Sequence, residues 1–196
     1  RIQLSITGPS SIMSSRIIPQ CLDVMRQFPS LMMQFLITDF AEREQTLRRG
    51  ESQFAIIPPE KVALEMDSKV LKPEEYVLVC SSQWRDRTLE EIVASERIID
   101  FDPSDQMTFN YLKLYDLFEH ARHDRHFANR TESLAMMLVA GLGYGLLTTE
   151  FSRPYVKRKE LMILNEGQRY ENVMALAWYK RPEPPAYFEA LIETIR

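Results

Sequence analysis

The sequence predicts an α/β fold in which helices cover both faces of a mostly parallel sheet. Ile2, Leu4 and Ile6 alternate with polar residues, as on a strand with one buried face. The residues that follow, up to Phe28, carry apolar side chains at helical spacing, and strands and helices continue to alternate along the chain. Because parallel neighbours require a crossover of about a dozen residues or more, this order favours a parallel sheet.

The composition is that of an ordinary globular protein. Of the 196 residues, 45% are hydrophobic and 27% are charged. Lys and Arg number 24 against 28 Asp and Glu, a formal net charge of -4, whereas a domain that binds duplex DNA clusters basic residues. The apolar stretches fall short of the roughly 20 residues of a membrane span. We therefore expect a soluble chain with neither DNA nor a membrane as its direct partner.

The cysteines and histidines show no spacing that is typical of a catalytic or metal-binding site. Cys21 and Cys80 lie in apolar surroundings at no motif spacing, which indicates buried thiols in a reducing compartment and a cytoplasmic location. His120, His123 and His126 are spaced by three, but six residues turn a helix about 120° away from the first position. We expect no metal, no cofactor and no enzymatic activity.

The first part of the chain supplies strands and helices in alternation. The strand at residues 2–7 ends at Gly8-Pro9, and Ser10 or Ser11 is expected to cap the helix that follows. The remaining elements are that helix up to Pro29, a strand at 32–37, a charged helix at 40–49 ended by Gly50, and an apolar strand at 54–57 ended by Pro58-Pro59.

A second set of elements begins after Pro73. Residues 70–71 and 76–80 are extended, and residues 173–179 are apolar on both faces, as on a central strand. The other elements expected are helices at 89–94, 107–120, 132–140 and 187–195, and strands at 98–101, near Phe127, at 144–148 and at 162–164.

Gly141, Gly143 and Gly145 lie close together in the segment VAGLGYGLL. A dinucleotide-binding glycine motif opens a helix after a strand, whereas these glycines follow a helix. We therefore expect Gly141 and Gly143 to end the helix at 132–140 and to turn the chain tightly into the next strand. A small transferase that binds phosphate at this turn is the enzyme alternative, and it would need a strand before the glycines.

Several motifs occur in a characteristic order and spacing. LRRGESQFAI covers residues 47–56 and VAGLGYGLL covers residues 139–147. The first helix carries Ile17-Ile18-Pro19 and ends in Phe28-Pro29. Over nearly the whole chain, these segments together resemble the effector-binding domain of LysR-type transcriptional regulators.

Two positions depart from that family's pattern. Gln53 stands where Asp is usual, and Thr148 stands where Pro is usual. Within the family, FDPSDQM at 101–107 and RRGE at 48–51 are most similar to the subgroup that responds to basic amino acids such as arginine and lysine.

The resemblance implies two Rossmann-like lobes joined by two crossing strands, the architecture of type 2 periplasmic binding proteins, with a small-molecule effector in the cleft. Lobe I would comprise residues 1–72 and 165–196, and lobe II residues 73–164. The family's N-terminal winged helix-turn-helix is absent from this chain, so DNA would be bound only through that missing domain. A free-standing periplasmic-type solute-binding protein, preceded by a secretory leader, is the alternative.

The resemblance also implies a homodimer or homotetramer, in which two effector domains pack side by side and antiparallel. The first helix is expected in this interface because its apolar residues cover more of its circumference than the single stripe that faces the core requires. Its apolar residues are Ile12, Met13, Ile17, Cys21, Val24 and Met25.

The ligand site is expected beyond the carboxyl ends of the strands, where helix N-termini present backbone N–H groups and a partial positive charge. Four residues are candidates to hold a carboxylate, Ser10, Ser11, Thr131 and Ser133, and of these Ser10, Ser11 and Thr131 are the predicted anchors. An ammonium or guanidinium group is expected to pair with Asp102, Asp105 or Glu132. Met13 and Pro58 complete the predicted set. The alternative for each serine or threonine is that it merely caps a helix.

Overall fold

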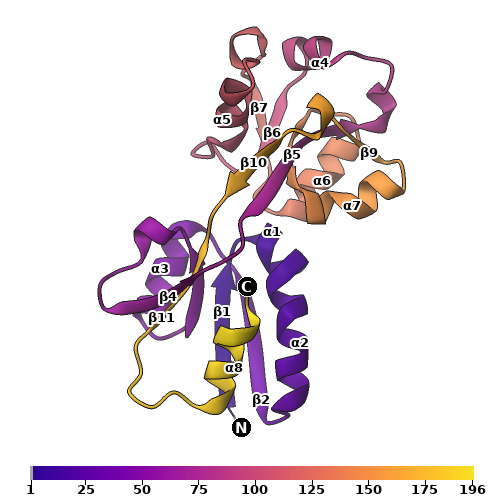
Figure 1. Cartoon of the computed structure of the whole chain (residues 1–196). Coiled ribbons are helices and arrows are strands. Elements are labelled where there is room, and N and C mark those ends of the chain that lie inside the picture. The colour runs from indigo at the N-terminus through magenta and orange to yellow at the C-terminus, as the bar shows by residue number, and fades with distance from the viewer. Residues whose placement is uncertain (1) are drawn as a thin grey trace. The chain divides into compact units, whose positions relative to one another are not determined.

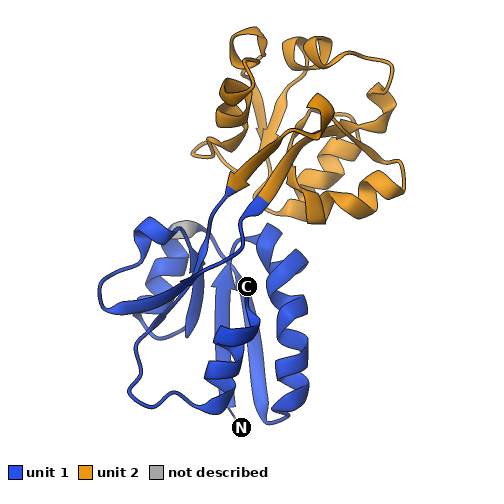
Figure 2. Cartoon of the chain, in the orientation of Figure 1, with its two compact units in different colours: residues 1–74, 172–196 blue, residues 75–171 orange. Residues whose placement is uncertain are grey.

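The computed structural model describes residues 2–196, except the side chain of Phe40 (Figure 1). The chain forms two compact units: unit 1 comprises Arg1–Glu74 and Asn172–Arg196, and unit 2 comprises Glu75–Glu171 (Figure 2). The predicted α/β class with two lobes is confirmed. The chain returns to unit 1 later than the predicted residue 165, because β10 (Arg169–Asn172) pairs with β5 (Glu74–Ser81), most of which belongs to unit 2.

Unit 1 is built on a sheet with the strand order β2-β1-β3-β11-β4 (Figure 1). The strands are β1 (Ile2–Gly8), β2 (Leu31–Ile37), β3 (Phe54–Ile57), β4 (Met66–Val70) and β11 (Ala175–Tyr179). β1 pairs in parallel with β2 and β3, and β11 is antiparallel to both β3 and β4. The central place of β11 explains why its sequence is apolar on both faces.

The first helix of unit 1 runs without a break from α1 through a π-helical segment into α2. The helices are α1 (Ser10–Ile12), η1 (Met13–Ile17), α2 (Ile18–Gln27), α3 (Phe40–Arg48), η2 (Pro59–Lys61) and α8 (Ala186–Thr194). The expectation that Ser10 or Ser11 caps the first helix is wrong. Pro9 occupies the N-cap position, so both serines lie inside the first turn, where they are buried.

Aromatic and aliphatic side chains from the sheet, the first helix and α8 form the core of unit 1. Phe54 stacks on Phe188 with 4.4 Å between ring centroids and meets Trp178 edge-on. The same core buries most of the apolar residues of the first helix, namely Ile12, Met13, Ile17, Cys21 and Val24, and packs against Met25. The apolar side chains singled out in the sequence for an interface between copies therefore pack inside their own unit.

Unit 2 departs from the mostly parallel sheet that the sequence favours. β5 is antiparallel to β8 and β9, whereas β6 pairs in parallel with β7 and bridges to Tyr144. The strands are β6 (Ile98–Asp100), β7 (Arg125–Phe127), β8 (Gly145–Thr148) and β9 (Leu161–Ile163). The helices are η3 (Ser82–Trp84), α4 (Leu89–Ser95), α5 (Met107–Leu114), η4 (Phe118–His120), α6 (Thr131–Val139), α7 (Thr149–Lys157) and η5 (Asn165–Gly167).

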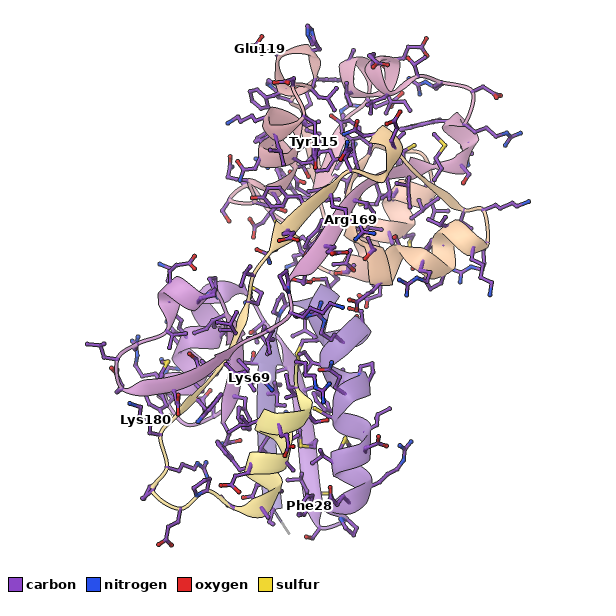
Figure 3. The ribbon with its side chains drawn as sticks, in the orientation of Figure 1. Phe28, Lys69, Tyr115, Glu119, Arg169 and Lys180 are labelled. Carbon is purple, nitrogen blue, oxygen red and sulfur yellow. The ribbon has the colours of Figure 1, made fainter. Side chains whose placement is uncertain are left out.

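Two tyrosines of unit 2 fasten the segment that leads into β10. The Tyr111 hydroxyl donates to the carbonyl oxygen of Gln168 at 2.8 Å. The Tyr115 hydroxyl donates to that of Arg169 at 2.5 Å, and both of these residues are labelled in Figure 3. The predicted helix at 107–120 ends early, at Leu114, because Asp116 adopts a φ of 57°. This early end places Tyr115 where it reaches Arg169, the first residue of β10.

The glycine-rich turn after α6 behaves as the sequence predicts. Gly141 has a φ of +76°, its N–H donates to the carbonyl of Leu138, and the N–H of Leu142 donates to the carbonyl of Met137. These two bonds are the Schellman pattern of a helix end. A Cβ on Gly143 would lie 2.5 Å from the carbonyl oxygen of Arg97, so only glycine fits there.

Gly143→Ala is expected to lower the free energy of unfolding of unit 2 by about 2–4 kcal/mol, because the methyl group must displace backbone. Gly167→Ala in the same unit is the comparison: its φ is +72° but the nearest atom to an added Cβ is 3.9 Å away. It should lose only about 1 kcal/mol. Urea unfolding followed by circular dichroism measures both, and equal losses would contradict the close approach.

Candidate functional site

The loops that follow β1, β2 and β3 lie at one edge of the unit 1 sheet, because these strands are parallel. The hydroxyl oxygens of Thr7, at the end of β1, and Thr38, after β2, are 2.6 Å apart and share a hydrogen bond. The loop after β1 leads directly into Ser10 and Ser11, and the loop after β3 begins with the half-buried Pro58. The structure thus places these three predicted residues at the predicted edge of the sheet.

Ser11 is tied to the two places where the chain leaves and re-enters unit 1. Its Oγ donates to Oε2 of Glu74 at 3.2 Å, and Nδ2 of Asn172 donates to the other carboxylate oxygen, Oε1, at 3.2 Å. The Glu74 side chain is buried. The start of the first helix and both crossing strands therefore meet at one carboxylate.

Arg16 adds a second connection between this helix and the first crossing strand. The side chain is buried, and its guanidinium donates to the carbonyl oxygens of Lys72 and Pro73. Arg16 lies in the π-helical segment η1. Such segments occur often at functional sites, because they re-aim side chains within a continuous helix.

Arg43 is a residue of the same edge that the sequence analysis missed. Its Nε donates to the carbonyl oxygens of Thr38 and Asp39, both at 3.2 Å, and its Nη1 donates to that of Ile56 at 3.0 Å. Burial lowers the pKa of Arg43 to about 10, against the opposing effect of Asp39. Its spacing of four from the buried Leu47 is the signal that places it on the inward face of α3.

Met13 lies in the core rather than at the surface of the edge. It is fully buried, and its Sδ lies 3.0 Å from the position that a Cβ on Gly8 would take. Met13 thus packs against the turn between β1 and the first helix. Its contact with a ligand stays a prediction.

Asp102 and Asp105 lie in the loop after β6, and both carboxylates are used inside that loop. Asp105 accepts from the backbone N–H of Phe101 at 3.2 Å and of Met107 at 3.0 Å. Asp102 accepts from the backbone N–H and the hydroxyl of Ser104, at 2.9 and 2.6 Å. Asp102 is nevertheless exposed, so its second oxygen lies at the surface of the loop.

Arg125 braces this loop from the neighbouring strand β7. Its guanidinium donates to the carbonyl oxygens of Asp105 at 2.6 Å and Pro103 at 3.1 Å, and to the carboxylate of Asp100 at 2.9 Å. The Asp100 side chain, which also accepts from Thr108 at 2.6 Å, is only 2% exposed. Sequence analysis missed this buried ion pair, which fixes the loop before any ligand arrives.

The N-terminus of α6 provides the other predicted residues of unit 2. Arg130 occupies the N-cap position and makes no side-chain capping bond there. Thr131, the first helical residue, is buried, whereas Glu132 and Ser133 are exposed. Glu132 thus sits on the first turn of the helix, and Thr131, expected just before a helix at 132–140, is its first residue instead.

The histidines and cysteines are the residue types considered above for metal binding and catalysis. His123 stacks on Phe118 with 4.2 Å between ring centroids. Within residues 2–196, no group of three or more His, Cys, Asp and Glu side chains is placed to hold a metal ion. Burial raises the pKa of the Cys21 and Cys80 thiols to about 12. No helix of the described chain has the length and apolarity of a membrane span.

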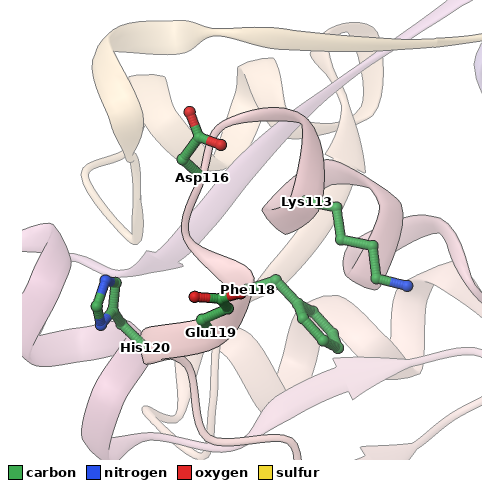
Figure 4. Close-up of a pocket in the computed structure, with 5 residues that line it drawn as sticks. All are labelled: Lys113, Asp116, Phe118, Glu119 and His120. Carbon is green, nitrogen blue, oxygen red and sulfur yellow. The ribbon is translucent and has the colours of Figure 1, made fainter.

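A cavity of about 380 Å³ lies where α5 leads into η4, lined by Lys113, Asp116, Phe118, Glu119 and His120 (Figure 4). None of the residues predicted to bind a ligand lines it. The carboxyl ends of the strands remain the place where the predicted residues gather, in each unit by itself.

Sequence comparison agrees with this fold and with these strand-end loops. The family described as LysR substrate binding domain matches residues 1–196. The chain belongs to this family. LysR substrate-binding domains are parts of transcriptional regulators, in which they bind a small-molecule effector. A comparison with curated protein sequences found no match.

Solved structures share the fold of this LysR domain. The C-terminal domains of a LysR family protein from Agrobacterium tumefaciens str. C58 have a TM-score of 0.82 at 16% identity, covering 100% of this chain and 97% of that one. Full-length LysG from Corynebacterium glutamicum with bound effector Arg has a TM-score of 0.79 at 18% identity, and ArgP from Mycobacterium tuberculosis 0.80 at 16%. The LysG match covers 99% of this chain and the ArgP match 100%, but the chain spans only 66% of either protein.

Asp100 is expected to give unit 2 a pH dependence. Its pKa is raised from 3.8 to about 6, first by burial and against the hydrogen bond from Thr108. Because the pKa of Asp100 is higher in the folded than in the unfolded chain, binding of a proton to this carboxyl stabilises unit 2. This contribution to stability is complete below about pH 4 and is lost as the pH rises through about 6.

The measurement is the free energy of unfolding across that pH range. The wild-type chain should lose stability relative to Asp100→Asn as the pH rises from about 4 to about 7. Asp102→Asn, an exposed acid of the same loop, is the control and should follow the wild type. Parallel curves for the wild type and Asp100→Asn would show that burial does not control this carboxyl.

Proposed function

We propose that this domain binds a small amphoteric molecule, with one set of contacts from each unit, and thereby controls the DNA binding of a cytoplasmic LysR-type transcription regulator. The observation that carries the proposal is a helix N-terminus in each unit, at α1 and α6, whose N-cap residue makes no side-chain capping hydrogen bond. Such N-termini bind anions, since their backbone N–H groups and the helix dipole favour negative charge. A ligand carboxylate fits them.

Exposed acidic side chains in the strand-end loop after β6 and on the first turn of α6 favour a ligand that also carries a cation. Asp102 and Glu132 are exposed, and a carboxylate forms its strongest hydrogen bonds with charged donors. A basic amino acid combines a carboxylate with such a donor. Because the LysG structure from Corynebacterium glutamicum holds arginine as its effector, L-arginine is the first probe.

The regulatory step follows from a ligand that touches both units. Such a ligand favours the conformation in which all its contacts exist, so its binding shifts the angle between the units. In the complete regulator, an N-terminal winged helix-turn-helix outside this chain would contact DNA and receive that shift. No residue of this domain is assigned a catalytic role.

Ser10→Ala and Thr131→Val are expected to weaken ligand binding about tenfold or more, because a hydrogen bond to a charged group contributes about 1.5–3 kcal/mol. A thermal-shift screen of amino acids, beginning with L-arginine, selects the ligand, and calorimetry measures its affinity. Ser133→Ala, exposed on the same turn as Thr131, is the control and should bind normally. Unchanged affinity in both variants would show that Ser10 and Thr131 are structural.

We also propose that two copies of the domain pair side by side and antiparallel. Large apolar side chains stand exposed on both units: Leu22 on α2 and Met32 on β2 in unit 1, and Phe127 on β7 and Met136 on α6 in unit 2. β2 is an edge strand of its sheet. In an antiparallel pair, the exposed side of α2 and β2 in one copy would meet α6 and β7 of the other.

Leu22→Glu and Met136→Glu are each expected to weaken the dimer about 30-fold or more, as loss of a central interface side chain costs about 2 kcal/mol. Sedimentation velocity over a range of protein concentrations measures the effect. Leu114→Glu alters another exposed leucine of unit 2 and should leave association unchanged. A wild-type domain that stays monomeric at high concentration would refute the pairing.

A further inference from the structure

Two adjoining grooves line the surface of unit 2 beside α7 and β9. One has a volume of about 550 Å³ and the other about 440 Å³. Val156 and Ile163 line both, so the grooves meet at these two apolar side chains. Leu161 and Met162 extend the apolar lining of the larger groove, and Ile163 is 42% exposed.

Cations surround this apolar centre. Arg85 and Lys159 line the larger groove, and Arg153, Lys157 and Arg169, the last of which is paired with Glu75, line the smaller one. No aspartate or glutamate is among the residues that line either groove, although acids outnumber bases in the whole chain. The dipole of α7 favours cations near its carboxyl end, but Arg85 and Arg169 come from distant parts of the sequence. The grooves therefore favour an occupant that is both apolar and acidic.

An apolar, acidic segment is present in unit 1 of the same chain. Leu64, between η2 and β4, is 97% exposed. The exposed acids Glu60, Glu65 and Asp67 flank it in the sequence together with one base, Lys61, and none of the three acids forms an ion pair with another residue of the described chain. The segment 60–67 thus presents a leucine that its own unit leaves in water, within an excess of negative charge.

We propose that Leu64 of one copy of this chain inserts into the grooves beside Ile163 of a second copy, with the acids of segment 60–67 facing the groove cations. Burial of the leucine removes apolar surface from water, and the opposite charges steer the encounter and fix its orientation. The apolar lining favours a protein segment over a phosphodiester backbone. Because the two patches differ, this contact is heterologous and joins further copies in addition to the side-by-side pair.

Disulfide trapping tests the contact directly. Native Cys21 and Cys80 are fully buried, so an introduced surface cysteine is the reactive thiol. With oxidised glutathione as the oxidant, a Leu64→Cys chain mixed with an Ile163→Cys chain should form a mixed disulfide at least about tenfold faster than with a Leu114→Cys chain, the matched exposed control. Equal rates for the two mixtures would overturn the proposal.

A double variant separates contact between copies from contact within one chain. In Leu64→Cys/Ile163→Cys, a contact between copies gives disulfide-linked multimers whose yield rises with protein concentration. A disulfide that closes within single chains at high dilution would overturn the assignment of the occupant to a second copy.

A charge exchange tests the polar part of the contact without relying on a disulfide. Lys157→Glu/Lys159→Glu should weaken association beyond the dimer about tenfold in low salt, by sedimentation velocity. Adding Glu65→Lys/Asp67→Lys to the same chain reverses the charge on both contacting surfaces and should restore this association. Association that is unaffected by the first pair, or not restored by the second, would overturn the proposal.

Discussion

The buried carboxylate of Glu74 joins the parts of unit 1 on which the rest of the arrangement depends. It accepts from Ser11 at the start of the first helix and from Asn172 where the chain re-enters the unit. A buried acceptor that loses a donor costs about 1–3 kcal/mol, so these groups are most stable when satisfied together. A displacement of the helix N-terminus is thereby coupled to both strands that lead to the other unit.

The spacing of apolar residues is sufficient to predict most strands and helices, because the side chains of a strand or helix that are buried in the core recur with the period of that element. β3 spans Phe54–Ile57, as the sequence predicts, and the apolar run at 173–179 proves to be a central strand. α7 escapes prediction because Pro154 lies inside it, a residue that usually ends a helix. The antiparallel pairing of β5 also escapes, since pairing depends on distant segments.

The candidate site is predictable as a set of loops but not as a set of side-chain contacts. Serine and aspartate after a strand mark the edge of a sheet at which the carboxyl ends of the strands lie, yet the same residues also form hydrogen bonds within the fold itself. Ser11 faces Glu74, and Asp105 holds the backbone before α5. The spacing of residues in sequence carries no information on which of two acceptors a short side chain reaches, because that choice is made by tertiary packing.

Each unit has, at its strand ends, a largely buried arginine that donates hydrogen bonds to loop carbonyl oxygens. Arg43 binds the carbonyls of Thr38, Asp39 and Ile56 in unit 1, and Arg125 binds those of Pro103 and Asp105 in unit 2. The planar guanidinium presents several donors in a fixed geometry, so one side chain orders a whole loop. Ordering a loop before binding removes an entropy cost of about 0.5–1.5 kcal/mol for each side chain that the ligand would otherwise immobilise. Each unit thus keeps its own strand-end loops ordered, and Glu74 holds the two strands that link the units.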